Sequence, residues 1–432
     1  MKILLISANT ETINMPVLPL GLAFVNAALR NNGFKTRMLN LLGEADVRAA
    51  IKTAIGGFSP DAIGISVRNI DTQDIKNPGS MLAPVKSMIA WCRAHTSAPV
   101  ILGGAGYSIY PQAVLDYTNA DMGIKGEGEI AFPELLRQLE KMGTNPEARS
   151  RLDIPGLYLP GTGAVQNRQC IRKTADVIFP VPGIHFIVPD TVKKDELWVP
   201  FQTRRGCPMD CSYCSTGSIE GRLIRKLPLD KAILSLAAHV EAGFRQFFFV
   251  DNTFNLPPAH AMDLCDRIIA AKINIRWRCI IYPSKISREL IAKMAQAGCQ
   301  EVSLGFESGS DAMLRHFNKR FTTADVRKTS DLLAEYGIRR LGFLMLGGPG
   351  ETKETVLESL AFADSLHPDA LKITAGIRIY PDTSLAAIAR KEGMIKDRDT
   401  LLAPVFYIRN ELKDWLMASI PAWIKNRPGY FF

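Results

Sequence analysis

Three cysteines stand close together near the middle of the chain. Cys207, Cys211 and Cys214 form the spacing C-x3-C-x2-C, in a sequence with 8 cysteines in all. Three thiolates on one loop can hold three corners of an iron-sulfur cubane, and thiolate is the ligand that such clusters prefer. The fourth iron then has no protein ligand and stays open to a small molecule. Zinc is the alternative, but a closed zinc site needs four ligands, and no histidine or fourth cysteine lies nearby at finger spacing.

The other cysteines are dispersed through apolar segments, where cysteine usually serves as a small buried hydrophobe. In a reducing compartment, this contrast favours metal or redox chemistry at the triplet over a disulfide framework. The dispersed cysteines are Cys92, Cys170, Cys265, Cys279 and Cys299.

Polar and glycine-rich segments recur after the triplet. Asp251 follows a run of three phenylalanines and a valine, Glu307 and Ser308 follow the apolar stretch 301–306, and Gly347 opens the run Gly-Gly-Pro-Gly-Glu. Each segment alone would be read as a turn or a helix cap. Their joint order behind the cysteines instead indicates one site to which several strands contribute.

The elements that must position these residues alternate between strand and helix from about residue 198 onward. Because an alternation of about six β/α units is typical of a partial barrel, the chemistry is expected at the carboxyl ends of its strands. The strands are expected at residues 199–203, 246–251, 275–280, 301–306, 341–346 and 370–373.

The first 140 residues or so alternate in the same way and predict a parallel, doubly wound sheet. Strands are expected at 2–7, 62–67 and 100–102, with a helix at 20–32. Ligands of such folds bind beyond the carboxyl ends of the strands, so the loops after these strands should share one rim. A last helix is expected at 130–141, behind the segment Gly-Glu-Gly-Glu.

The cysteine triplet, with the aromatic Tyr213 before its third cysteine, resembles the signature of the radical S-adenosylmethionine (SAM) superfamily, and the later segments follow in the order of that family. The N-terminal half resembles the cobalamin-binding domain attached to one large subclass of these enzymes. The segments that carry this second resemblance are 19–22, 66–71, 102–106 and 126–129.

The resemblance covers roughly residues 1–385 and implies an α/β fold with two domains. It predicts a Rossmann-like cobalamin-binding domain at 1–145, a linker at 146–197, a partial (β/α)6 radical SAM barrel at 198–385 and a small C-terminal segment at 386–432.

By the same resemblance, the cofactors are a 4Fe-4S cluster on Cys207, Cys211 and Cys214, SAM and cobalamin. The chain has no Asp-x-His-x-x-Gly motif to supply a histidine to cobalt, so we expect base-off, His-off cobalamin; a vestigial, empty domain is the alternative. The residues expected at SAM are Tyr213, Ser215, Asp251, Glu307, Ser308, Arg320 and Gly347, and those at cobalamin are Leu18, Gly21, Arg68, Asn69, Gly103, Gly104 and Glu127.

The function that this resemblance implies is methylation of an unactivated carbon, using methylcobalamin and a 5′-deoxyadenosyl radical. Tyr282 is a candidate to donate a hydrogen or a proton. A radical rearrangement, cyclisation or dehydration in natural-product or lipid biosynthesis is the enzymatic alternative. A non-catalytic cobalamin or redox sensor is the alternative from another class, although the SAM-facing segments would be unnecessary for sensing.

Composition limits the partners. The formal net charge is +9, which suits an acidic electron donor such as flavodoxin or ferredoxin. No dense basic block interleaved with aromatics points to nucleic acid, and the substrate, a small molecule or a peptide, is undetermined. No apolar run reaches the ~18 residues that span a bilayer, and no signal sequence is evident, so we expect a cytoplasmic enzyme.

Overall fold

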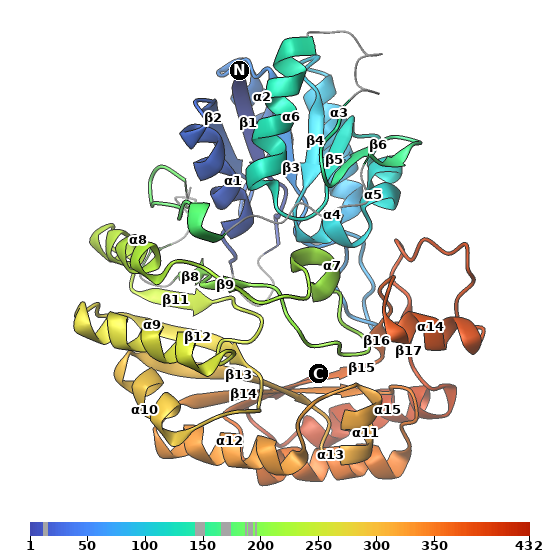
Figure 1. Cartoon of the computed structure of the whole chain (residues 1–432). Helices are drawn as coiled ribbons and strands as arrows, with labels where there is room; N and C mark the ends of the chain where they lie inside the picture. Colours follow the sequence, from blue (N-terminus) through green and yellow to red (C-terminus); the bar gives the residue numbers. More distant parts are fainter. Residues whose placement is uncertain (12–15, 143–151, 166–173, 186–187, 189–192, 195–196) are drawn as a thin grey trace.

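The computed structural model has two α/β halves, one stacked on the other (Figure 1). The N-terminal half carries one 7-stranded sheet and the C-terminal half another. The structure describes residues 1–11, 16–142, 152–165, 174–185, 188, 193–194 and 197–432.

The sheet of the N-terminal half has the order β2-β1-β3-β4-β5-β6-β7. Its first five strands are parallel, whereas β6 and β7 are antiparallel additions at one edge. The strands are β1 (Lys2–Ser7), β2 (Lys35–Asn40), β3 (Ala62–Ser66), β4 (Val100–Gly103), β5 (Met122–Ile124), β6 (Leu157–Leu159) and β7 (Gly163–Ala164).

Helices cover both faces of this sheet, because its central strands are apolar on both sides. Along β1, Ile3 and Leu5 pack with α1 and α6, while Leu4 and Ile6 pack with α2, α3 and α5. The helices are α1 (Leu20–Asn31), α2 (Val47–Gly56), α3 (Leu82–Arg93), α4 (Ala105–Ile109), α5 (Pro111–Thr118) and α6 (Gly128–Met142).

The C-terminal half is a partial barrel whose sheet has the order β18-β15-β14-β13-β12-β11-β8. All its strand pairs are parallel. The strands are β8 (Trp198–Phe201), β11 (Gln246–Phe249), β12 (Arg276–Ile281), β13 (Cys299–Glu307), β14 (Arg339–Leu346), β15 (Ala370–Ala375) and β18 (Tyr430–Phe431).

Helices follow the barrel strands, and two small antiparallel ribbons lie beside them. The ribbons are β9 (Arg204–Arg205) with β10 (Arg225–Lys226), and β16 (Ile377–Arg378) with β17 (Phe406–Tyr407). The helices are α7 (Thr216–Glu220), α8 (Leu229–Glu241), α9 (Pro258–Ala270), α10 (Arg288–Gln296), α11 (Asp311–His316), α12 (Thr323–Glu335), α13 (Lys353–Ser365), α14 (Ser384–Lys391) and α15 (Asn410–Ile424), and a short 3-10 helix lies between the halves at Thr174–Asp176.

The two halves share buried apolar side chains. Leu18 and Phe24 of the N-terminal half belong to the barrel core, and Ile377 and Tyr407 belong to the core under β3 and β4. A short ribbon, β9 and β10, and helix α7 lie where the halves meet (Figure 1). The cysteine triplet is therefore held at the junction, between β9 and α7.

The predicted fold class is confirmed: a doubly wound domain precedes a six-unit partial barrel. The sequence patterns did not predict the parallel strands β2 and β5 of the N-terminal sheet, the edge strands β6 and β7, or the strand β18, which extends the barrel sheet. The last helix of the N-terminal half also begins at Gly128, earlier than expected. The exact domain boundaries stay predictions.

Candidate functional site

The loop that carries the cysteine triplet begins at a glycine that has no room for a side chain. Gly206 has a φ of 84°, and a Cβ there would lie 2.1 Å from the Leu223 carbonyl oxygen. The next residue, Cys207, donates its backbone N–H to the Gly221 oxygen at 3.1 Å. This close approach fixes where the loop leaves β9 and where its first thiol lies.

The three thiols of the triplet are free and differ in exposure: Cys207 is buried, Cys211 half-buried and Cys214 exposed. Burial, with smaller contributions from the nearby Cys214 and Cys211, raises the pKa of Cys207 to about 11. Among the described residues, no three metal-binding side chains yet converge closely enough to hold an ion. These three cysteines nevertheless fit a cluster with three thiolate ligands, since all three are free, lie on one loop and interact electrostatically.

A tyrosine, a glutamate and a lysine join this loop to the barrel strand β13. The Tyr213 hydroxyl donates to Glu307 Oε1 at 3.0 Å and accepts from Lys319 Nζ at 2.8 Å. Lys319 also lies 3.5 Å from the Glu307 carboxylate. Burial raises the pKa of Tyr213 well above its ordinary value. Lys319 was not predicted as a site residue, although it directly precedes the predicted Arg320.

The Asp251 carboxylate binds groups of the segment that directly precedes the cysteine triplet. Its carboxylate accepts hydrogen bonds from Thr203 N at 2.7 Å, Thr203 Oγ1 at 2.6 Å and Arg204 N at 3.0 Å. Arg204 Nε adds an ion pair at 3.3 Å, with both side chains buried. Asp251 therefore fastens the end of β11 to the segment that leads into the cysteines.

Ser308 and Gly347 lie at neighbouring strand ends, and the bonds that they make are internal. The Ser308 hydroxyl lies 2.9 Å from Ser359 Oγ and accepts from Ser310 N at 3.1 Å. Gly347 N donates to the Glu351 carboxylate. Burial raises the pKa of Glu351 to about 7, and its Oε1 has no hydrogen-bond partner in the described structure.

Tyr282 directly follows β12 on the same side of the barrel. Its hydroxyl accepts from Arg320 N at 2.7 Å, and burial raises its pKa. The Arg320 side chain is 56% exposed and pairs with Asp210 at 2.9 Å. Ser215, the N-cap residue of α7, makes no side-chain capping bond. Tyr282 and Arg320 are thus brought together, next to the cysteine loop at Asp210.

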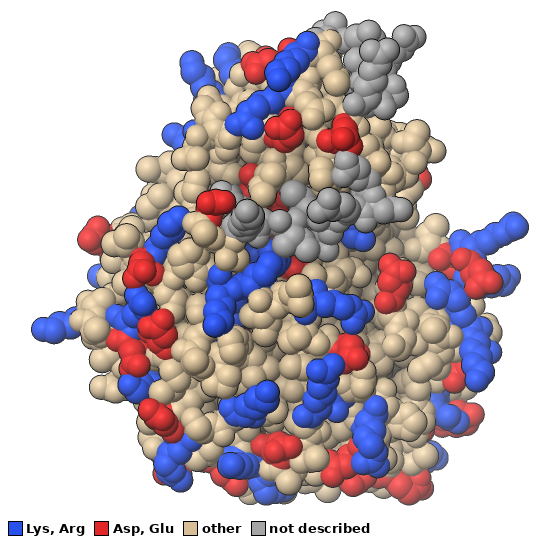
Figure 2. Space-filling model, in the orientation of Figure 1, with Lys and Arg blue, Asp and Glu red and all other residues tan. Residues whose placement is uncertain are grey.

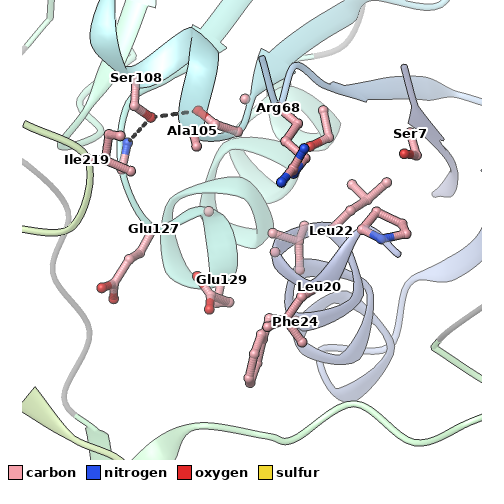
Figure 3. Close-up of a pocket in the computed structure, with 18 of the residues that line it drawn as sticks. Ser7, Leu20, Leu22, Phe24, Arg68, Ala105, Ser108, Glu127, Glu129 and Ile219 are labelled. Atoms are coloured by element: carbon pink, nitrogen blue, oxygen red, sulfur yellow. Dashed lines mark hydrogen bonds between the residues drawn. The ribbon is translucent and has the colours of Figure 1, made fainter. Parts of the chain in front are cut away.

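A cavity of about 500 Å³ lies between the two halves, beyond the carboxyl ends of β1, β3 and β4. Figure 3 shows Arg68 on one side of it and Glu127 and Glu129 on another. Of the residues predicted for cobalamin, Asn69 does not line this cavity. Those that do are Leu18, Gly21, Arg68, Gly103, Gly104 and Glu127.

Glycines make the rim of this cavity. Gly104 has a φ of 100°, and a Cβ there would lie 2.6 Å from the Val67 oxygen. At Gly21, by contrast, a Cβ would meet nothing within 4 Å, so this position opens onto free space. Ser108 Oγ donates to the Gly104 oxygen at 2.8 Å and accepts from Gly126 N at 3.0 Å, which ties two rim loops together (Figure 3). A large, mostly apolar, glycine-rimmed cavity fits a corrin cofactor with its tail.

The opposite wall of the cavity comes from the barrel half, including α7, the helix that follows Cys214. The sequence did not identify these residues, because they are in contact with the cavity only once the two halves are packed together. The wall residues are Pro200, Gln202, Arg205, Thr216, Ile219, Glu220, Val250 and Asn252. The cavity and the cysteine loop are therefore neighbouring sites.

Two protein-family models match this chain, one in each half. Residues 6–136 match the B12 binding domain, and residues 202–363 match the radical SAM superfamily. The first match spans the glycine-rimmed side of the cavity, and the second spans the cysteine loop and the strand ends around it.

Relatives with both parts are known. The chain is 28% identical to an uncharacterised methyltransferase of Pyrococcus horikoshii, over 89% of this chain and 82% of the relative. It is 24% identical to the tryptophan 2-C-methyltransferase of Streptomyces laurentii, over 88% of this chain and 73% of the relative. Its fold matches the structure of TsrM from Kitasatospora setae with cobalamin and a [4Fe-4S] cluster bound, with a TM-score of 0.81, 23% identity and coverage of 90% and 78% of the two chains.

The chain is a radical SAM enzyme with an N-terminal B12-binding domain. Its cofactors are those of this class: a 4Fe-4S cluster, SAM and cobalamin. The side chains that hold them are not identified by these comparisons.

The helices, the surface charge and the remaining cysteines of the described structure can be compared with the expectations from the sequence. None of its helices is long and apolar enough to pass through a lipid bilayer. Figure 2 shows Lys and Arg interspersed with Asp and Glu over the face in view, without a continuous basic stripe. Of the dispersed cysteines, Cys92, Cys265, Cys279 and Cys299 are buried as expected, while Cys170 lies outside the described residues.

Proposed function

We propose that this enzyme methylates an unactivated carbon of a small molecule or a peptide. The observation that carries the proposal is the shared helix α7: it follows Cys214 directly, and its residues Thr216, Ile219 and Glu220 line the cavity at the B12-binding domain. A methyl donor in the cavity and a radical generator on the cysteine loop would thus face one reaction space.

Cys207, Cys211 and Cys214 are the proposed protein ligands of the cluster. When bound, the cluster and SAM supply a 5′-deoxyadenosyl radical, and cobalamin supplies the methyl group. The chain's share is positioning and exclusion of water. Tyr213 and Glu307, joined at 3.0 Å, brace the cysteine loop that would hold the cluster against the end of β13.

At the proposed SAM site, the protein offers two kinds of surface. The backbone N–H groups of Gly347 and Gly348 are held by the Glu351 carboxylate, and this glycine segment would lie beside the adenine. Arg320 and Tyr282 form the more polar side. Asp251 and Ser308 would act at this site by positioning neighbouring residues, because the bonds that the structure shows for them are to protein groups.

At the proposed cobalamin site, Arg68 is the polar group on the rim opposite Glu127. Burial lowers the pKa of Arg68 below its ordinary value. No histidine lines the cavity within the described residues. These facts support cobalamin held without a histidine ligand, with Arg68 among the residues that would hold it.

An external one-electron donor, such as flavodoxin or ferredoxin, would supply the reducing equivalents. The net charge of +9 favours an acidic donor of this kind. We also propose a location in the cytoplasm, where such donors and a reducing environment coexist.

The experiment is an anaerobic reaction of the reconstituted chain with hydroxocobalamin, a reductant and SAM labelled with deuterium on its methyl group. Methyl transfer predicts both S-adenosylhomocysteine and 5′-deoxyadenosine, with the label appearing on the corrin. 5′-Deoxyadenosine without S-adenosylhomocysteine would contradict methylation and would favour rearrangement, cyclisation or dehydration. Cys214→Ala is the control: it should bind cobalamin but form no 5′-deoxyadenosine.

A further inference from the structure

Arg205 bridges the two halves of the molecule. It lies on β9, two residues before Cys207, and is 5% exposed. Its guanidinium forms ion pairs with Glu129 at 2.7 Å and Glu127 at 3.3 Å, at the start of α6. Its charged group also lies 4.8 Å from the centre of the Phe24 ring on α1. Three groups of the B12-binding domain thus hold a residue of the cluster loop.

The bonds continue from Arg205 into the loop itself. Arg205 Nε donates to Gln202 Oε1 at 3.0 Å, and Gln202 Nε2 donates to Glu220 Oε1 at 2.9 Å. Glu220 Oε2 accepts from Gly206 N at 3.0 Å, directly before the first cysteine. We name Glu129, Arg205, Gln202 and Glu220 the bridging network. It runs without a break from α6 to the start of the cysteine loop.

The bridging network is also a wall of the cavity, because each of its four side chains lines it. Glu220 reaches one step further, since Asn252 Nδ2 donates to its Oε2 at 2.6 Å, and Asn252 follows β11. An occupant of the cavity would press on the same side chains that orient the cysteine loop. Hydrogen bonds to charged groups in a buried setting are strong and directional, so a shift at one end is felt at the other.

We propose that the bridging network couples the two cofactor sites, so that cobalamin binds more tightly when SAM is bound, and SAM more tightly when cobalamin is bound. Arg205 acts here as a positioning residue. The two effects must be equal, because coupling between binding sites is reciprocal. The inference rests on the presence of both cofactors, as the proposed function does, but not on methyl transfer.

The neighbouring Arg225 provides a matched control. It stands opposite Arg205 in the β9 and β10 ribbon and forms its own ion pair with Glu127, at 2.6 Å. It also donates to the Glu220 backbone oxygen at 2.8 Å. Arg225 therefore also joins the two halves, but through Glu127 and a backbone oxygen and not through the side chains of the bridging network. It tests whether the bridging network itself, and not just any buried ion pair between the halves, carries the coupling.

The test is an absorbance titration of the cluster-reconstituted chain with hydroxocobalamin, with and without saturating SAM and without reductant, so that no turnover occurs. For the wild type, we expect SAM to lower the cobalamin Kd by about 5-fold to 150-fold, the usual range of such coupling. Arg205→Gln should reduce this ratio to near one, whereas Arg225→Gln should keep it. Iron content should remain that of the wild type in both variants.

A second variant keeps the test decisive if Arg205→Gln fails to fold. Gln202→Met has a similar volume but breaks both bonds in the middle of the bridging network, and it should also bring the ratio to near one. A wild-type ratio of one overturns the proposal, as does an unchanged ratio in Arg205→Gln or Gln202→Met, or an equal loss in Arg225→Gln. Because only binding is measured, an enzyme that transfers methyl groups without coupling would refute this inference alone.

Discussion

Lys319 is a buried positive charge that acts on two thiols of the cysteine loop, Cys207 and Cys211. Burial raises the pKa of Cys211, and the Lys319 ammonium opposes that rise. The same charge lies between the Tyr213 hydroxyl and the Glu307 carboxylate. A buried cation beside an anionic cluster should favour the reduced cluster, because reduction adds negative charge.

Replacing this charge should therefore make the cluster harder to reduce. We expect Lys319→Gln to shift the midpoint potential to a more negative value; a shift of about 60 mV corresponds to a tenfold change in the reduction equilibrium. The measurement is a redox titration followed by electron paramagnetic resonance. Arg320→Gln, which removes a 56% exposed charge, should shift the potential less. A positive shift in Lys319→Gln would show that its charge does not act on the cluster.

Glu351 predicts a dependence of stability on pH. Burial raises its pKa from 4.5 to about 7 in the folded chain, so the folded state binds this proton more tightly than the unfolded state does. The resulting stabilisation is complete below about pH 4.5 and is lost as the pH rises through about 7.

Replacing the Glu351 carboxylate by an uncharged amide should abolish this loss of stability at higher pH. At pH 5, Glu351→Gln should unfold at nearly the wild-type temperature. At pH 7.5 it should unfold at a higher temperature than the wild type, and the gain in the free energy of unfolding should be at most about 3 kcal/mol. The control is Glu354→Gln, whose carboxyl is exposed on the same segment. A difference between Glu351→Gln and wild type that stays constant from pH 5 to 7.5 would refute this account of the carboxyl.

At the scale of elements, two glycines at the cavity rim have different duties. Gly104 precedes α4 with a φ of 100° and touches the Val67 oxygen, whereas Gly21 lies in α1 and opens onto free space. Gly104→Ala should destabilise the fold by about 1–3 kcal/mol, because an L side chain is strained there. Gly21→Ala should preserve or raise stability, as alanine favours helix, yet weaken cobalamin binding by intruding into the cavity.

Thermal unfolding and cobalamin titration of the two variants separate these effects. Equal loss of stability in both would contradict the assigned duties. So would unchanged cobalamin affinity in Gly21→Ala.

The order of the elements follows from patterns that lie within short stretches of sequence. The apolar run of β1 and the periodic helix α1 were predictable, because burial on both faces requires continuous apolar residues. The strand β2 was not predicted, because its sequence Lys-Thr-Arg-Met-Leu-Asn contains no apolar run. The strands β5, β6, β7 and β18 were not predicted either, because each has only 2 or 3 residues and pairs with a strand already in place. Such short strands have no period to detect.

The residues of the functional site were likewise predictable only where they form a pattern within a short stretch of sequence. The cysteine triplet and the glycines at 103 and 104 carry their own spacing signal. Arg205 carries none, because its partners Glu127 and Glu129 are distant in sequence and meet it only when the two halves pack.

At the scale of the whole molecule, a buried ion pair joins the halves on the far side of the cysteine loop from Arg205. Arg378 Nε lies 2.9 Å from Asp71 Oδ2, with side-chain exposures of 4% and 0%. Asp71 ends the loop that begins at Arg68, so this pair fixes one rim of the cavity relative to β16. Arg378 also donates to the backbone oxygens of Ile379 and Leu401.

Breaking this pair from one side should be costly, because the remaining charge stays buried without its partner. Arg378→Met should destabilise the chain by about 3–5 kcal/mol. The double variant Asp71→Asn with Arg378→Met should lose less than the sum of the two single variants, which urea unfolding can measure. Strict additivity would show that the two side chains do not interact.

If one chain holds a cluster with an open iron beside a bound corrin, both cofactors should survive purification together. The decisive measurement is anaerobic reconstitution with iron, sulfide and hydroxocobalamin, followed by desalting, metal and corrin analysis, and reduction in the presence of SAM. We expect about four irons and one corrin per chain, with formation of 5′-deoxyadenosine. A chain that retained no corrin, or whose metal was fully ligated by protein and never cleaved SAM, would contradict this expectation.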